Sequence, residues 1–532
     1  MGVFITLAAL ALIAYLFYRW SVATYDYFEK RGVPFLRPKP LVGSLWPVFS
    51  GQKHAMDAAQ EGYWVFPEAR FSGFFMFRKP GYLIHDPELI KQITIKDFDH
   101  FTDHANNITP ELDPFLGRSL FFAEGHRWKP GRTGLSPAFT GSKMRNMMVL
   151  LYNYLEGAME RLKEDANGGK FEKEMKDFFQ RLGNDVTTSI SFGVEVDSFR
   201  DPDNQFLEAG KLLTATDGLQ GFKFFLITFF PEKLFTALNI RVTPQKVAEF
   251  YEEAVSKSIK HREENNIVRP DFIHLLLQAR KNELKEDHND DKFDSAGFST
   301  VQEHLQAPSG TAKSSEWTDL DIAAAAASFF FGGIETTTVF LSFTIYELAL
   351  NPDIQDKLRA EIDATTETLN GKNLSYEAMQ QMKYLDQVVT EALRRWTSFG
   401  ITNRKCVKEY TFENSDGTKV TIEKGTLIQI PMAAIHLDAK YYPNPLRFDP
   451  ERFSEENRHQ LNPNAYMPFG MGPRNCIGSR LALMQAKCFL FYILKHFTVE
   501  ISQKTDVPIQ IDKRSVGVKT LSGIWVYLTP RS

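Results

Sequence analysis

The feature that most constrains this chain is a short glycine-rich loop that ends in a cysteine. Residues 469–478 read FGMGPRNCIG, and an apolar run continues from them to Lys495. Because that run is apolar around most of a helical circumference, it predicts a buried helix with Cys476 at its N-terminus. Backbone amides and the helix dipole favour negative charge at such a position. We therefore expect the pKa of the Cys476 thiol to be lowered, which gives the thiolate that binds metals.

The other residues of this loop fit a flat, anionic cofactor that carries a metal. Gly470 and Gly472 allow positive φ and close backbone approach, so amides can point at the sulfur. Gly478 leaves room for a flat object, and Arg474 supplies a cation for an anion on that object. Haem is such a cofactor, and cysteine is one of its known axial ligands. A buried, inert cysteine is the usual alternative, but it does not account for this spacing.

A second chemical motif lies inside a long predicted helix. A capping pattern at Thr318 begins a helical pattern that continues to Leu350, and Asn351-Pro352 then ends it. Within the pattern, residues 331–337 read FGGIETT. Two glycines inside a helix each cost about 1 kcal/mol relative to alanine, so a compensating reason is expected.

That reason is predicted to be space for a small ligand. The Thr336 hydroxyl can bond the carbonyl of Gly332, four residues earlier, and bend the helix. Without side chains, the two glycines open a groove for a diatomic ligand and a water. Glu335 and Thr336 then supply a carboxyl and a hydroxyl for proton relay. The alternative is that the glycines only allow close helix packing.

These two motifs and three others resemble those of the haem-thiolate monooxygenases of the cytochrome P450 family. In chain order they are W-x-x-x-R at Trp128 and Arg132, FGGIETT at 331–337, E-x-x-R at Glu391 and Arg394, P-E-R-F with Arg452, and F-x-x-G-x-R-x-C-x-G from Phe469 to Gly478. The resemblance covers residues 30–532. It implies the cytochrome P450 fold, mainly α with small β-sheets and one large haem-binding domain, although the length of 532 residues alone favours two domains.

The resemblance also implies a role for individual residues. Glu335 and Thr336 would be catalytic, and Cys476 would be the metal ligand of haem b. The implied cofactor-binding residues are Trp128, Arg132, Arg404, Phe469, Arg474, Cys476 and Gly478. A buried charged triad with a structural role would consist of Glu391, Arg394 and Arg452. Thr397 and Ser398 stand where many members carry prolines, a departure that concerns the pocket over the haem rather than the chemistry.

The N-terminus predicts a membrane anchor. Residues 2–18 are almost entirely apolar, and no Lys or Arg precedes them as in a cleaved signal peptide. Basic residues follow from Arg19 onward, so the positive-inside rule places the body on the cytoplasmic side. We expect a transmembrane anchor at 1–20, a basic, proline-rich linker at 21–45 and the catalytic domain at 46–532. Resemblance to microsomal members implies the endoplasmic reticulum membrane, with that domain on its cytoplasmic face.

Composition and charge narrow the choice of partners. A net charge of −4 lacks the basic footprint of a nucleic-acid-binding protein. Three cysteines form no disulfide framework and fit a reducing, cytosol-facing compartment. The resemblance implies NADPH electrons that arrive through a membrane-bound NADPH-cytochrome reductase, with cytochrome b5 as an optional second donor. Arg127, Lys129 and Lys487 are the cations expected to contribute to docking on the cysteine side.

The implied function is insertion of one oxygen atom from O₂ into lipophilic organic substrates. Residues 136–145, SPAFTGSKMR, and the cysteine loop resemble the insect microsomal branch associated with xenobiotic and insecticide metabolism. Two alternatives stay open: a dedicated hydroxylase of an endogenous hormone or fatty acid, and a non-catalytic haem-thiolate sensor. The pair Glu335-Thr336 argues against the sensor, because a gas sensor has no need of proton delivery.

Two further stretches carry expectations about the surface. Residues 221–235 read GFKFFLITFFPEKLF and are either core or a patch that dips into the membrane beside the anchor. Residues 281–315 are polar and poor in apolar side chains, so we expect an exposed connection there.

Overall fold

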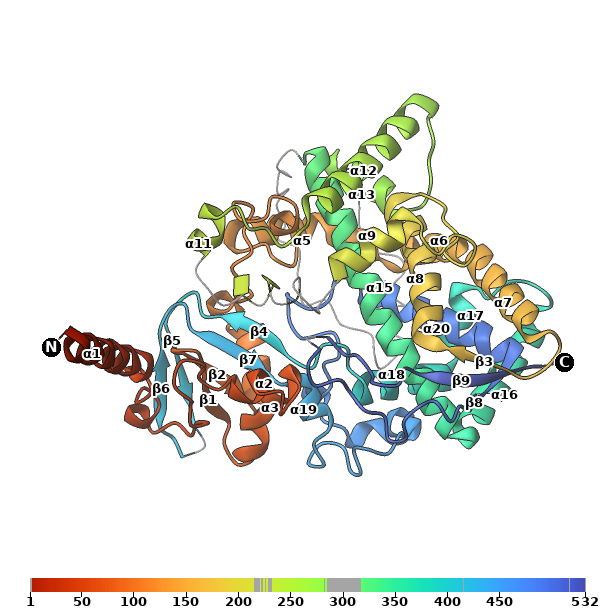
Figure 1. Cartoon of the computed structure of the whole chain (residues 1–532). Helices are drawn as coiled ribbons and strands as arrows, with labels where there is room; N and C mark the ends of the chain where they lie inside the picture. The colour runs from red at the N-terminus through yellow and green to blue at the C-terminus, as the bar shows by residue number, and fades with distance from the viewer. Residues whose placement is uncertain are drawn as a thin grey trace.

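Helices make up most of this computed structural model, and the strands form small sheets at two places (Figure 1). The structure describes residues 2–531 except 215–220, 222, 225, 228–231, 282, 285–316, 415 and 516. This architecture confirms the predicted fold class, which is mainly α with small β-sheets.

The helices of the described chain are α1 Gly2–Val22, α2 Trp46–Phe49, α3 Ala55–Val65, α4 Pro87–Lys91, α5 Trp128–Leu135, α6 Gly141–Met148, α7 Tyr152–Ala166, α8 Met175–Phe192, α9 Gln205–Thr214, α11 Glu232–Ala237, α12 Gln245–Asn265, α13 Phe272–Arg280, α15 Asp319–Leu350, α16 Pro352–Leu369, α17 Tyr376–Gln381, α18 Lys383–Arg395, α19 Met432–His436 and α20 Ser479–His496. The strands are β1 Phe71–Met76, β2 Lys79–Ile84, β3 Phe171–Glu174, β4 Thr402–Lys405, β5 Tyr410–Glu413, β6 Lys419–Ile422, β7 Leu427–Ile430, β8 Phe497–Ile501 and β9 Trp525–Pro530.

The central helix is α15, which crosses the middle of the molecule in Figure 1. Its N-terminus carries a capping box: the Thr318 side chain accepts from the Asp321 amide, and the Asp321 carboxylate accepts from the Thr318 amide. Its C-terminus is Leu350, directly before Asn351-Pro352, so both predicted ends of this helix are confirmed. α15 packs against α8, α12, α18 and α20 and lies in the largest apolar core. This burial explains why so apolar a helix belongs inside the fold.

The sheets position segments on either side of that core. Four strands pair in the order β1-β2-β7-β4, and β4 places Arg404 opposite Ile428 of β7. A second sheet has the order β3-β9-β8, and β5 pairs with β6 as a separate hairpin. β8 follows α20 without a break, since α20 ends at His496 and β8 begins at Phe497. The second sheet therefore fixes the C-terminal end of the helix that follows the cysteine loop.

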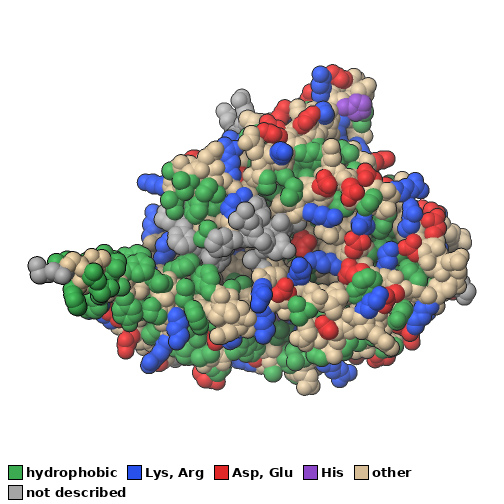
Figure 2. Space-filling view, viewed as in Figure 1, with side chains coloured by type: hydrophobic (Ala, Val, Ile, Leu, Met, Phe, Trp, Pro, Cys, Tyr) green, Lys and Arg blue, Asp and Glu red, His purple; other side chains and the backbone are tan. Residues whose placement is uncertain are grey.

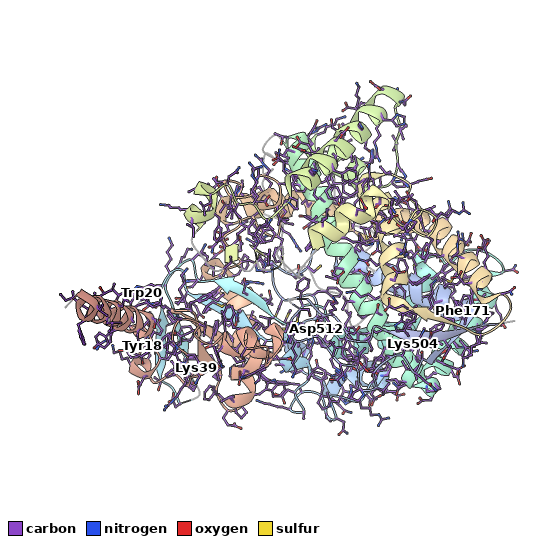
Figure 3. All side chains as sticks on the ribbon, viewed as in Figure 1. Tyr18, Trp20, Lys39, Phe171, Lys504 and Asp512 are labelled. Atoms are coloured by element: carbon purple, nitrogen blue, oxygen red, sulfur yellow. The ribbon has the colours of Figure 1, made fainter. Side chains whose placement is uncertain are left out.

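The N-terminal helix α1 stands apart from the body, and hydrophobic side chains cover it (Figure 2). It is long and apolar enough to cross a membrane, and its apolar window is not buried in the fold. α15 passes the same test, but 61% of its window is buried, as expected for a core helix. At the end of α1, Trp20 stacks under the guanidinium of Arg78 at 4.1 Å, where the helix meets the body (Figure 3).

The segment expected as a linker, residues 21–45, packs on the first sheet. Phe28 and Val33 are buried in the apolar core around β1 and β2. The Gly73 amide of β1 donates to the carbonyl of Pro34 at 2.8 Å. These contacts hold the base of α1 against the body. The two boundaries given for the chain, at 20 and 45, stay predictions.

Two sequence expectations fall wholly or partly outside the described residues. Nearly all of the polar stretch 281–315 lies outside them. Of the aromatic stretch 221–235, Ile227 and Phe235 are buried against a small apolar cluster that includes Ile108, whereas Leu234 is half exposed. The described part thus contains both core positions and apolar surface.

Candidate active site

The cysteine loop has the backbone that its glycines predict. Gly470 and Gly472 both have φ of 75°, the left-handed region open to glycine. A Cβ on Gly472 would lie 1.9 Å from the carbonyl oxygen of Thr94, so this position also requires glycine for space. The Cys476 amide donates to the Phe469 carbonyl at 2.8 Å and closes the loop. These contacts fix the cysteine relative to the rest of the loop.

The Cys476 side chain is reached by solvent although protein atoms surround it. It precedes α20, whose first residue is Ser479, and the Gly478 amide donates toward its sulfur. A Cβ on Gly478 would meet no atom within 4 Å, so a flat group has room beside this turn. The thiol and the space next to it therefore fit a planar, metal-bearing cofactor.

One electrostatic expectation for Cys476 is wrong for the polypeptide alone. Burial raises the pKa of the Cys476 thiol, and the Gly478 amide and the charge of Arg132 only partly oppose this effect. The sequence argument considered the helix terminus, which stabilises a thiolate. It did not consider desolvation, which disfavours the thiolate of Cys476. A metal ion at the sulfur reverses that balance, because a coordinating thiol is deprotonated outright.

The middle of α15 carries the predicted threonine contact. The Thr336 hydroxyl donates to the Gly332 carbonyl at 2.5 Å. Gly332 is exposed in this largely buried helix, and a Cβ there would meet no atom within 4 Å. Gly333 differs, since its Cβ would lie 3.5 Å from Thr187 of α8. Gly332 thus borders open space, whereas a methyl group at Gly333 would make ordinary van der Waals contact with α8, so neither glycine is required for close helix packing.

Two contacts beside Thr336 were not predicted. The Lys176 ammonium of α8 lies 3.1 Å from the Glu335 carboxylate, with both side chains about one-third exposed. The Ser398 hydroxyl donates to the Thr336 carbonyl at 3.0 Å. Ser398 stands where many members of the family carry a proline. A proline at this position has no hydroxyl and could not donate this hydrogen bond. Glu335 therefore has a cation partner, and the segment after α18 is tied to α15.

The predicted W-x-x-x-R pair lies against the cysteine loop. Trp128 and Arg132 are both buried on α5. Arg132 donates to the carbonyl of Asn475 at 2.9 Å and to its side-chain oxygen at 2.6 Å. The Trp128 ring lies under the guanidinium of Arg474 at 4.2 Å. The face of α5 that carries Trp128 and Arg132 therefore packs on the cysteine loop.

Two further buried arginines approach the same region. Arg474 donates to the carbonyls of Thr102 and Ala123, both at 2.7 Å, and burial with the charge of Arg404 lowers its pKa to about 9. Arg404 is 1% exposed, its Nε has no hydrogen-bond partner among the described residues, and burial lowers its pKa to about 10. Depressed pKa values show that both cations lack enough compensating negative charge.

The charges around these arginines fit an anionic ligand. The arginines are Arg132, Arg404 and Arg474, and the nearby acids are Asp103 and Glu124. Glu124 already pairs with Lys405 at 3.1 Å, which leaves Asp103, 3.5 Å from Arg474. Guanidinium groups are suited to carboxylates. The carboxylates of haem would therefore find an excess of buried positive charge here, and the residues present fit that cofactor.

The three residues expected as a structural triad come together in the fold. Glu391 receives two hydrogen bonds from Arg394, at 2.6 and 2.8 Å, and Arg452 lies 3.5 Å from the same carboxylate. The side chains of Glu391 and Arg394 are fully buried, and that of Arg452 is 9% exposed. Arg394 also donates to the carbonyl of His436 at 2.7 Å, and the His436 ring accepts from the Met467 amide at 3.0 Å. A chain of contacts therefore leads from the triad to the segment that enters the cysteine loop.

The prediction that Lys487 contributes to partner docking is wrong. Lys487 of α20 is buried and pairs with Asp386 at 2.8 Å, so it does not offer free surface charge. Arg127 and Lys129 are exposed beside α5. Lys487 lies within α20, whose apolar sequence already predicted a buried helix. The sequence argument should have given that pattern more weight than the charge of the lysine.

An accessible cysteine at a buried turn, space beside it and a cluster of buried arginines together fit a haem-thiolate site. A family model described as cytochrome P450 matches residues 33–526. The chain belongs to the cytochrome P450 family, whose members are monooxygenases.

Relatives from two insects cover nearly the whole chain. The probable cytochrome P450 9f2 of Drosophila melanogaster is 39% identical over 99% of both chains. Cytochrome P450 9e2 of Blattella germanica is 39% identical over 98% of this chain and 97% of its own, and cytochrome P450 6k1 of the same insect is 35% identical over 98% and 95%. The predicted resemblance to this family is thereby confirmed.

Proposed function

We propose that this chain is a membrane-anchored monooxygenase that oxidises lipophilic xenobiotics with NADPH electrons delivered through a flavoprotein reductase. The observation that carries the chemistry is the Thr336 hydroxyl held on the Gly332 carbonyl, beside open space in a buried helix. The choice of xenobiotics over an endogenous substrate is supported by the resemblance of residues 136–145 and the cysteine loop to the insect microsomal branch.

The proximal side of the proposed site is built by the cysteine loop. Haem bound there would supply the oxygen-activating chemistry, with cysteine as the ligand that favours O–O cleavage. Cys476 would hold the iron, and the Gly478 amide would moderate the charge on the sulfur. Phe469 is partly buried against the main core and anchors the start of the loop. Arg404, with Trp128, Arg132 and Arg474 around it, would receive the carboxylates.

The distal side is formed by α15. Thr336 would present a hydroxyl whose hydrogen is held by the Gly332 carbonyl and could be turned into the open space beside that glycine. Glu335 would take protons from solvent, because it is partly exposed, and the Lys176 ammonium, 3.1 Å away, would hold its carboxylate in place. Ser398 would fix the carbonyl of Thr336 and so the orientation of that residue. These groups hold and move protons at one wall of the site.

We further propose that α1 anchors the protein in the endoplasmic reticulum membrane with the catalytic body on the cytoplasmic face. Support comes from its apolar surface and from the basic residues that follow Arg19. Electrons would reach the cysteine side through NADPH-cytochrome reductase or cytochrome b5. The exposed cations Arg127 and Lys129 lie beside α5, which packs on the loop, and would steer an acidic partner.

The first experiment is the carbon monoxide difference spectrum of the reduced protein. We expect a strongly red-shifted Soret band in the wild type and its loss in Cys476→Ala. Cys406→Ala is the matched control, because Cys406 is buried in the core around β1 and β2 and its thiol donates to the Lys408 carbonyl. Retention of the band in Cys476→Ala, or its absence from folded, haem-loaded wild type, would remove the proposed ligand.

The substrate proposal needs a second experiment. Wild type reconstituted with reductase and NADPH is offered a panel of lipophilic insecticides beside insect hormones and fatty acids. We expect oxidised products from several structurally unrelated insecticides. Turnover of a single endogenous compound alone would favour the dedicated hydroxylase. Neither product nor compound-dependent NADPH oxidation with any compound would favour the sensor.

A further inference from the structure

Glu347 is a buried carboxylate that has no role in the site described above. It lies on α15 and is 6% exposed. Burial raises the pKa of Glu347, and the Trp396 indole and the charge of Arg395 only partly oppose this effect. A buried charged group is costly unless it is well paired, so the partners of this carboxylate matter. Its shortest contact is with Trp396, whose indole nitrogen donates to it at 2.7 Å.

Arg395 is the weaker partner of this carboxylate. Its Nε lies 3.9 Å from Glu347, which is beyond hydrogen-bond distance, and this Nε has no hydrogen-bond partner among the described residues. The guanidinium lies instead over the Trp396 ring at 4.3 Å. The Phe343 ring of α15 stacks on Trp396 with 4.2 Å between centroids and 13° between planes. We call Phe343, Glu347 and Trp396 the Trp396 clamp, because two residues of α15 fix one indole.

The Trp396 clamp lies at the start of the segment that contacts Thr336. Ser398, two residues after Trp396, donates to the Thr336 carbonyl at 3.0 Å. Phe343 and Glu347 follow Thr336 by seven and eleven residues, so the three lie on one face of α15. Two extended residues span at most about 7 Å. Little slack therefore separates the contact made by Trp396 from the contact made by Ser398.

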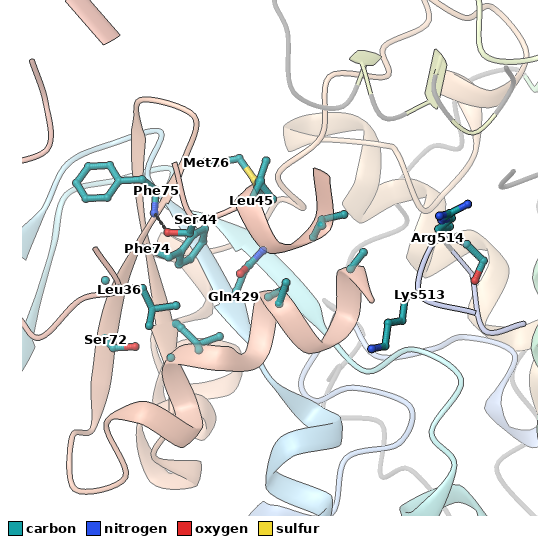
Figure 4. A pocket seen from close by; sticks show the side chains of 18 of the residues that line it. Leu36, Ser44, Leu45, Ser72, Phe74, Phe75, Met76, Gln429, Lys513 and Arg514 are labelled. Carbon is teal, nitrogen blue, oxygen red and sulfur yellow. Dashed lines mark hydrogen bonds between the residues drawn. The ribbon is translucent and has the colours of Figure 1, made fainter. Parts of the chain in front are cut away.

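The far end of this segment is also fixed. The Ala433 amide donates to the Gly400 carbonyl at 2.9 Å, and a Cβ on Gly400 would lie 3.2 Å from the Cβ of Ala433. The chain then enters β4, where Asn403 lies opposite Gln429 of β7, a residue labelled in Figure 4. Only residues 397–399 thus lie between the two fixed ends, and the serine bonded to α15 is the middle one.

The residues between these ends contribute little stiffness of their own. Thr397 and Ser398 lack the ring with which a proline fixes φ. The Thr397 hydroxyl is buried without a hydrogen-bond partner among the described residues, and its amide makes no backbone hydrogen bond there either. The path of this short stretch therefore depends on the contacts at its ends.

We propose that Glu347 and Trp396 are positioning residues, which hold residues 397–400 on α15 and so place the Ser398 hydroxyl on the Thr336 carbonyl. The consequence for catalysis rests on the proposed function, because it acts through the relay hydroxyl of Thr336. The competing explanation is that Glu347 only balances the charge of Arg395. In that case the carboxylate charge matters and the indole hydrogen bond does not.

The first measurement does not depend on turnover. Full-length, haem-loaded protein is treated with chymotrypsin, and cleavage after Phe399, which is 55% exposed, is followed by mass spectrometry of the fragment that begins at Gly400. Such cleavage tracks local opening of the chain. Each rate is divided by that of a synthetic peptide with the same sequence, which removes the effect of the substitution on the protease.

Trp396→Phe keeps an aromatic ring in the clamp and loses the indole hydrogen bond. It should speed this cleavage by about three- to fivefold. The matched control is Trp525→Phe, which loses an indole hydrogen bond to the Ser522 carbonyl at 3.1 Å and should be cleaved after Phe399 at the wild-type rate. Thr397→Pro, placed in the Trp396→Phe chain, should return the rate toward that of the wild type, because the proline ring restricts the freed segment.

The second measurement is coupling, the product formed per NADPH consumed. Trp396→Phe and Glu347→Ala should each lower coupling by about three- to fivefold, whereas Glu347→Gln, which keeps an oxygen for the indole, should behave as the wild type. Trp396→Phe combined with Ser398→Ala should fall no further than Ser398→Ala alone, because both act through one contact. Thr397→Pro should rescue coupling in Trp396→Phe but not in Ser398→Ala.

Three results would overturn the proposal. The first is cleavage of Trp396→Phe at the wild-type rate. The second is equal damage from Glu347→Gln and Glu347→Ala, which would assign the carboxylate to Arg395. The third is a multiplied loss of coupling in the variant that combines Trp396→Phe with Ser398→Ala. If the wild type forms no product, the proposed function fails, and the cleavage rates still decide whether the clamp holds the segment. Circular dichroism and haem content of each variant separate lost positioning from lost folding.

Discussion

The triad around Glu391 gives the sharpest prediction about stability. Its carboxylate is fully buried and accepts three hydrogen bonds, two from Arg394 and one from the Asp449 amide at 2.9 Å. Arg452 lies 3.5 Å away. In Glu391→Gln the amide nitrogen faces one of these donors, and two buried guanidinium groups lose their counter-charge. Removing one member of a buried ion pair costs about 3–5 kcal/mol, a large share of the roughly 5–15 kcal/mol that stabilises a fold.

The measurement is the urea midpoint of unfolding, followed by tryptophan fluorescence. The matched control is Glu455→Gln, which breaks an exposed pair with Lys383 at 3.0 Å, where both side chains are about two-thirds exposed. Such a surface pair contributes about 0–1 kcal/mol. If Glu391→Gln shifts the midpoint no more than Glu455→Gln does, the triad does not support the fold as argued. The same variant should also destabilise the cysteine loop. Arg394 donates to the His436 carbonyl, and His436 contacts the segment that enters this loop.

Three shorter predictions concern the site and its support. Thr336→Ala should lower coupling, the product formed per NADPH consumed, by roughly tenfold or more, because the proposed relay hydroxyl is lost. Hydrogen peroxide should rise in parallel. Unchanged coupling would refute the proton-relay role of Thr336. Ser398→Ala removes one half-buried hydrogen bond of about 1 kcal/mol, so coupling should fall by up to about fivefold, while Ser398→Thr, which keeps a hydroxyl, should behave as wild type. Burial lowers the pKa of His436 to about 3, and the neutral ring accepts the Met467 amide, so protonation favours the unfolded chain. Stability should therefore decline as pH falls below about 6.5, by up to about 1.4 kcal/mol per unit from this group, and His436→Gln should flatten that part of the urea midpoint profile against pH.

Local features of the fold could be predicted from the sequence because their causes are local. Thr318 and Asp321 cap α15 within one turn, and Pro352 follows its last residue closely. The left-handed glycines of the cysteine loop and the bond from Thr336 to Gly332 likewise depend on residues close in the chain. Spacing along a helix or turn is enough to place such contacts.

The remaining contacts join residues that are far apart in the chain. Lys176 meets Glu335 across 159 positions, and Arg132 meets Asn475 across 343. No spacing rule connects such pairs, and nothing in their local sequence distinguishes them from ordinary surface residues. The raised pKa of Cys476 has the same origin, since desolvation depends on what the whole fold packs around the thiol. The family model matches residues 33–526 as one stretch, and the predicted division into anchor, linker and a single catalytic domain stays a prediction.

Arg404 allows the last test, because its two roles predict changes of opposite sign. It is buried, its Nε lacks a partner among the described residues, and its other contacts are to backbone carbonyls and a weak one to a hydroxyl. An uncompensated buried cation is costly, and replacing buried ions by hydrophobic residues of similar size often stabilises a protein by about 1–4 kcal/mol. Arg404→Met should therefore raise the urea midpoint of the haem-free chain. It should also speed haem transfer to apomyoglobin, because the carboxylates lose their cation. If the urea midpoint and the rate of haem transfer both fall in Arg404→Met, Arg404 is a structural residue, and the site is not preorganised for an anion.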